Sequence, residues 1–171
     1  MERLIRIWSR ARRGALYAML LVLFLLLQEA VFIHVAPFGV RAMFLPALVV
    51  AVGLFEGGWQ GGVFGLAAGV LSDLCGTGIH VLFTVLYPLM GFAMGFLAEF
   101  LVNRRFYVYL VGAVAALFLS AFCQMFRLWI FHGASFWRLL AVALGQSVFS
   151  LPLAVPYYYI SRAFHRRRAL R

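Results

Sequence analysis

Charge is scarce in this sequence, and lysine is absent from it altogether. Only 12% of the 171 residues are charged, and five of these are acidic, whereas 65% of the residues are hydrophobic. A soluble domain of ordinary composition contains about 25% charged and about 45–50% apolar residues. The composition therefore excludes an ordinary soluble domain and predicts an integral membrane protein.

Recognisable chemical motifs are also missing. The four histidines fall at the ends of predicted spans without the spacing of a metal site, and there is no phosphate-binding loop. Cysteine occurs twice, as Cys75 and Cys123, inside or at the edge of apolar stretches. Small buried side chains are the first interpretation of these cysteines, and a disulfide is the second. We therefore expect no catalytic residues, no metal and no cofactor.

Six apolar stretches are candidates for transmembrane helices, each of which needs about 20 residues to cross a bilayer. They are residues 15–36, 42–56, 58–76, 79–102, 106–131 and 137–160. The second is short for a crossing. The first follows a charged start like that of a signal peptide, but no convincing cleavage site follows it, so we expect a retained helix. Residues 1–171 then form one all-α transmembrane domain with six spans.

The arginines cluster at the two ends of the chain and in one short loop. Twelve of the fifteen lie within residues 3–13, 104–105 and 162–171. Cytoplasmic loops of membrane proteins carry an excess of arginine, so both termini are predicted to be cytoplasmic, which requires an even number of spans. The net charge of +10 then indicates anionic lipids at the arginine-rich termini, and no nucleic acid.

Small residues recur along the third predicted span with the spacing of one helix face. At 100° per residue a strict four-residue repeat drifts by about 40° per step, whereas a 4-3 repeat stays on one side. The predicted face consists of Gly58, Gly62, Gly65, Gly69, Ser72 and Gly76. Small residues allow close helix contact in lipid, and a 4-3 spacing favours left-handed packing at about +20°.

This face predicts a central third helix with a packing seam along its length. Gly91 and Gly95 in the fourth span are its predicted partners, because they form a GxxxG pattern. Two alternatives remain for the same face. It could be a smooth wall for a substrate or a partner's helix, or the contact of a homodimer.

Three charged residues fall in the outer third of predicted spans: Glu29, Asp73 and Arg127. A charge near the bilayer centre costs roughly 2.5–3.5 kcal/mol on insertion scales, so each one calls for a partner. We predict that Arg127 pairs with Asp73, with Glu29 or with both, and so ties spans one, three and five together. The alternative is that these charges reach the outer interface as topological anchors.

Three stretches carry a resemblance to a known family. They are "LLLQEAVF", "RAMFLPALVVAVGLFEGGWQGGVFGLAAGVLSD" and "GIHVLFTVLYPLMGFAMGFL", which follow an arginine-rich start. Together they resemble the bacterial rod shape-determining protein MreD over about residues 15–105. The family often carries Pro-Asp where the second span begins, whereas Pro46 is followed here by Ala47. The positions that fall on the family pattern are Gln28, Pro46, Gly65, Gly69, Asp73, Gly91 and Gly95.

The resemblance implies a multi-pass protein of the bacterial inner membrane, with a fold like that of the S components of vitamin transporters. It also implies a non-enzymatic scaffold of cell-wall elongation that associates with MreC. The wall-synthesising transpeptidase and glycosyltransferase, and the MreB filament, are further implied partners, directly or indirectly. The alternative function is a substrate-binding S component for a vitamin or another small molecule. An intramembrane enzyme acting on lipid is a third interpretation, for which the sequence supplies no chemistry.

Overall fold

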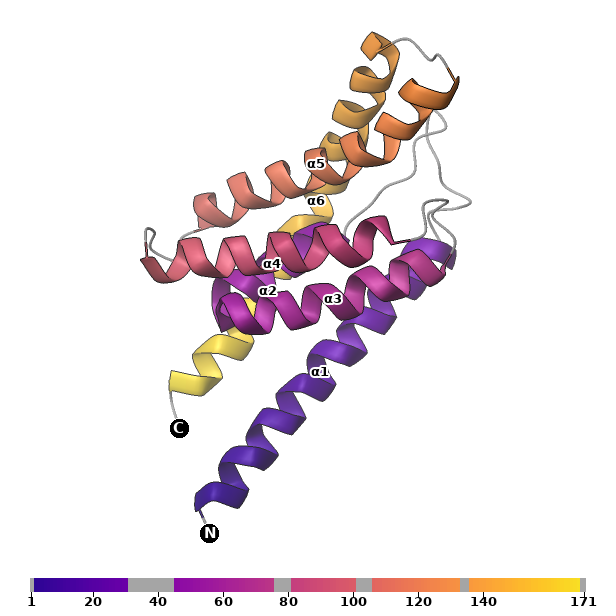
Figure 1. Ribbon diagram of the computed structural model, residues 1–171. Helices are drawn as coiled ribbons and strands as arrows, with labels where there is room; N and C mark the ends of the chain where they lie inside the picture. Colours follow the sequence, from indigo (N-terminus) through magenta and orange to yellow (C-terminus); the bar gives the residue numbers. More distant parts are fainter. Residues whose placement is uncertain (1, 31–44, 76–80, 101–105, 133–135, 170–171) are drawn as a thin grey trace.

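The computed structural model describes residues 2–30, 45–75, 81–100, 106–132 and 136–169, which form six helices (Figure 1). They are α1 (Glu2–Ala30), α2 (Leu45–Glu56), α3 (Gly58–Leu74), α4 (Leu82–Phe100), α5 (Phe106–His132) and α6 (Phe136–Ala169). The predicted all-helical class is confirmed. Each helix overlaps one predicted apolar stretch, but α1 begins well before residue 15 and α6 continues past residue 160.

Two helices are long and apolar enough to cross a membrane. They are α4 and the Phe106–Gln124 part of α5. Helix α6 is a third candidate if its two parts, Leu140–Pro152 and Ala154–Ala163, form one span with a bend of 43°. Gly14–Gln28 of α1 and all of α2 are shorter apolar helices. The described residues therefore define a helical membrane protein with two or three crossing helices by this measure, where the sequence predicts six.

Helix α2 occupies the centre of the bundle. Every residue from Leu45 to Phe55 is buried, and α2 contacts each of the other five helices. A helix that is apolar all round is expected to be covered on all sides, and "LPALVVAVGLF" is such a sequence. The prediction that the third span is the central helix was therefore wrong. Helix α3 carries small residues on one face only, and Trp59 and Leu74 are exposed on another face.

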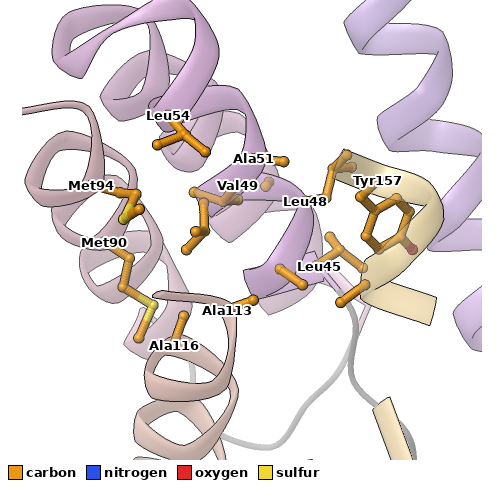
Figure 2. Close-up of a cluster of buried hydrophobic side chains, with 14 of the residues drawn as sticks. Leu45, Leu48, Val49, Ala51, Leu54, Met90, Met94, Ala113, Ala116 and Tyr157 are labelled. Carbon is orange, nitrogen blue, oxygen red and sulfur yellow. The ribbon is translucent and has the colours of Figure 1, made fainter. Parts of the chain in front are cut away.

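The core forms where α2 meets the helices around it (Figure 2). Figure 2 shows Val49 and Leu54 of α2 near Met90 and Met94 of α4. On other sides of α2 lie Tyr157 of α6 and two alanines of α5, Ala113 and Ala116. The alanines matter because their short side chains let α5 approach α2 closely.

One tyrosine joins three of these helices by hydrogen bonds. The hydroxyl of Tyr109 on α5 donates to the carbonyl oxygen of Ala154 on α6 at 2.8 Å and contacts that of Ala47 on α2 at 3.3 Å. The same region of α6 contains Pro156, which has no N–H for the carbonyl of Pro152. A proline within a helix is an ordinary cause of a bend, and the 43° bend of α6 lies in this region.

Candidate functional site

Helices α3 and α4 approach each other until their backbones touch. A Cβ atom placed on Gly65 would lie 2.6 Å from the carbonyl carbon of Tyr87, and one on Gly69 would lie 2.6 Å from that of Phe83. Real Cβ atoms essentially never make contacts under 3.0 Å. Only glycine is therefore compatible with this contact between the two helices.

The closest approaches recur every fourth residue on both helices. In antiparallel order the facing pairs are Gly61 with Gly91, Gly65 with Tyr87, and Gly69 with Phe83. At the end of the series, Gly95 of α4 meets the backbone of Gly58 and Gly57. We name these positions of α3 and α4 the backbone contact.

The four-residue step differs from the predicted 4-3 seam for a geometric reason. A 4-3 seam stays in contact with a partner that crosses the helix at a small angle, about +20°. Rows of residues spaced by four are inclined to the axis, so they stay in contact with a partner that crosses obliquely. Gly61, Gly65 and Gly69 form such a four-residue row, and this row touches α4.

Most predicted seam residues still lie on the side of α3 that is buried. Gly58, Gly65, Gly69 and Ser72 are buried, as are Gly91 and Gly95 on α4. Gly76 lies outside the described residues.

The predicted face includes Gly62 and omits Gly61, but Gly61 is the residue that lies in the contact. A Cβ on Gly62 would find its nearest atom, Cβ of Phe92, at an ordinary 3.7 Å. A Cβ on Gly61 would lie 2.6 Å from Cα of Gly53 on α2. Gly61 thus meets both α2 and α4, and its place in the four-residue repeat was the signal that could have found it.

A single residue, Gly57, separates α2 from α3. Its φ of 99° lies in the region that glycine adopts far more readily than other residues. The N–H of Gly57 donates to Gly53 at 3.0 Å, and the N–H of Gly61 donates to Gly57 at 2.9 Å, so hydrogen bonding continues through the turn. The carboxylate of Glu99, at the end of α4, lies beside Gly57. This turn fixes α2 and α3 as one hairpin against α4.

Asp73 caps the opposite end of the α3–α4 pair. Its Oδ2 accepts from the N–H of Thr84 at 2.8 Å and from the Thr84 hydroxyl at 2.6 Å, while Oδ1 accepts from the N–H of Phe83 at 3.2 Å. The first turn of a helix has unsatisfied N–H groups and a partial positive charge, and a carboxylate stabilises both. The capped turn follows Val81, whose φ of 84° is unusual for a β-branched residue.

This cap is a role for Asp73 that the sequence analysis missed. The predicted pairing with Arg127 and Glu29 involves side chains outside the described part of the structure, so it stays a prediction. The partners of Asp73 that the structure describes belong to the first turn of α4. A carboxylate close before a new helix, with a threonine in its first turn, was the available signal.

The buried serines of α5 and α6 bond to their own helices. Ser120, Ser147 and Ser150 each donate to the carbonyl oxygen four residues earlier, at 2.8 Å. Such bonds satisfy a hydroxyl without a ligand or a neighbouring helix. The cysteines are not in a disulfide, and Cys75 is exposed, contrary to the first interpretation of it as buried. Among the described residues, no group of three or more His, Cys, Asp or Glu side chains could hold a metal.

The fold and these contacts define the class of the protein as a helical membrane protein, in which Asp73 and Tyr109 join neighbouring helices by hydrogen bonds. Comparisons with protein-family models, with curated proteins and with solved structures found no match to the chain.

Proposed function

We propose that this protein is a non-enzymatic scaffold of bacterial cell-wall elongation, of the MreD type, in the inner membrane. The observation that carries the proposal is the backbone contact between α3 and α4. Four glycines that fall on the MreD pattern, Gly65, Gly69, Gly91 and Gly95, are the residues at which the two helices touch or nearly touch. Asp73, a fifth position of that pattern, closes the same pair by its cap.

These contacts suit a scaffold because they hold α3 and α4 in fixed positions relative to each other. We call this α3–α4 pair the block. Backbones that touch leave no room for side-chain rearrangement, and packed interiors transmit strain instead of absorbing it. Helix α2 fills the inner side of this block, and large apolar side chains cover its outer side. A rigid apolar face in a bilayer suits the binding of a partner's membrane-spanning helix, such as the single span of MreC.

The proposed topology has six spans with both termini in the cytoplasm. The distribution of arginine supports it, since twelve of fifteen arginines then lie on the cytoplasmic side. The start of α1 and the end of α6 lie toward the same end of the molecule in Figure 1, which also supports it. In this topology the Gly57 turn faces the cytoplasm, and the Asp73 cap lies toward the outer surface.

Co-purification from a mild detergent tests the proposed function. We expect an affinity-tagged chain, expressed in its own host, to recover MreC and the elongation transpeptidase. A matched pair of variants links the recovery to the block: Gly65→Leu inserts a side chain into the backbone contact, and Leu66→Val changes the exposed neighbour on the same helix. Gly65→Leu is expected to lose MreC, and Leu66→Val to retain it.

Other outcomes of the same experiment contradict the proposal. Recovery of an energy-coupling membrane subunit with ATPases, and thermal stabilisation by a vitamin, would instead identify an S component. Equal recovery of MreC by wild type and by a Gly65→Leu variant with a disrupted α3–α4 pair would refute the role of the block.

A further inference from the structure

Aromatic rings from three helices meet near the C-terminal end of α6. The ring of Tyr158 lies 5.1 Å from that of Phe106 on α5 and 5.4 Å from that of Phe55 on α2, measured between centroids. Tyr109 adds a third ring at 5.5 Å. Tyr158 is only 3% exposed, so its ring is held in one position by rings on several sides. Tilted and edge-on rings at these separations attract one another.

Arg162 lies over this fixed ring. Its guanidinium carbon is 5.8 Å from the centroid of Tyr158, one helical turn earlier, which is within the range of a cation–π interaction. Arg162 is exposed, and within the described part of the chain no carboxylate forms an ion pair with it. The ring therefore orients a guanidinium whose N–H groups remain available to an anion.

We infer that Arg162 and the Tyr158 ring form a discrete site for the phosphate of an anionic phospholipid headgroup. The planar fork of guanidinium N–H groups matches phosphate oxygens in a bidentate manner. The site lies where the apolar part of α6 gives way to "SRAFHRRRALR", so a headgroup there is at the level of the membrane surface. Tyr159 beside it is 58% exposed, and tyrosine is typical of that level in the bilayer.

This inference goes beyond the proposed function and does not depend on it. A role in wall synthesis requires protein partners, whereas this site requires only the surrounding lipid. It also differs from a general attraction of the arginine-rich ends to anionic membranes. The strength of a general attraction depends on the number of charges and is screened by salt, whereas a discrete site binds one lipid at one arginine.

Native mass spectrometry of the full chain in mild detergent tests the site, with phosphatidylglycerol and phosphatidylcholine as probes. We expect one phosphatidylglycerol per chain to remain bound between about 0.05 and 0.5 M ammonium acetate, while phosphatidylcholine is lost. Arg162→Gln is expected to lower the bound fraction about tenfold, because a charge-assisted hydrogen bond is lost. Arg171→Gln, which removes the same charge from the same terminus, is the control and should change it less than about twofold.

Two more variants separate the Tyr158 hydroxyl from its ring, and the charge of Arg162 from its planar guanidinium. Tyr158→Phe keeps the aromatic face under Arg162 and should retain the lipid. Arg162→Lys keeps the charge but not the planar fork and should lower the bound fraction about threefold. Both changes are small, and Arg162 is exposed, so we expect folded proteins.

The site is overturned by any of three results. Equal losses in Arg162→Gln and Arg171→Gln would mean that the terminal charges attract lipid collectively. Equal retention of phosphatidylcholine would mean that the lipid phosphate alone, without net negative charge, explains the binding. Displacement of phosphatidylglycerol by millimolar inorganic phosphate would assign the site to a free anion.

Discussion

Adding one methyl group to Gly65 should separate α3 from α4, whereas the same addition to Gly62 should not. The new Cβ at Gly65 lies 2.6 Å from a backbone carbon of α4, and ordinary contacts begin at 3.4 Å. The two backbones must therefore move apart by about 1 Å, which weakens dispersion contacts along the pair. At Gly62 the nearest atom is already at 3.7 Å.

The two variants share every other effect of the substitution. Glycine to alanine within a helix favours the helix by about 1 kcal/mol in both variants, so this contribution cancels in the comparison. Overpacking costs about 1–3 kcal/mol, and a rigid backbone neighbour places Gly65→Ala at the upper end of that range. We expect Gly65→Ala to be less stable than Gly62→Ala by about 2–3 kcal/mol, or about 5–10 °C in Tm.

Thermal unfolding in one detergent, followed by circular dichroism, measures the difference. If Gly65→Ala and Gly62→Ala have the same Tm, the backbones do not touch at Gly65, and the protein lacks the rigid α3–α4 pair on which the proposed scaffold depends.

Three further predictions concern other contacts. Asp73→Ala should lower the free energy of unfolding by about 1–2 kcal/mol through loss of the α4 cap, whereas Asp73→Asn should retain most of the stability that the cap contributes. An equal loss of stability in both variants would favour an ion pair over a cap. Tyr109→Phe should cost about 1–2 kcal/mol in a denaturation series, with exposed Tyr159→Phe as the neutral control. In spheroplasts, a membrane-impermeant maleimide should label Cys75 and not a Cys75→Ser variant; protection of Cys75 would reject the six-span orientation.

The sequence predicts the helices well because hydropathy and glycine punctuation are local properties. The predicted stretch 58–76 corresponds to α3, and the turn before α3 lies at Gly57, directly beside a second glycine. Helix packing is less predictable, since it depends on the angle at which a partner crosses. That angle decides whether Gly61 or Gly62 lies in the contact, and nothing within α3 alone specifies it.

The roles of individual polar residues were hardest to predict. A carboxylate near the end of an apolar helix suggests an opposite charge as its partner, but backbone N–H groups satisfy the same need. Asp73 finds its described partners in the first turn of α4, about ten residues further along the chain. Likewise, no local pattern around Tyr109 marks its role, and only the arrangement of three helices shows its hydrogen bonds.

The complete enclosure of α2 has a consequence for biogenesis. Its 12 residues extend about 18 Å, less than the roughly 30 Å of a bilayer core, and its final neighbours include α5 and α6. Tyr157, which packs beside it, is synthesised about 100 residues after α2 is complete. At about 5–20 residues per second, α2 waits about 5–20 s for this neighbour. During that interval lipid, the translocon or a chaperone must shield it, so truncation after α4 should leave the centre of the protein open to proteolysis.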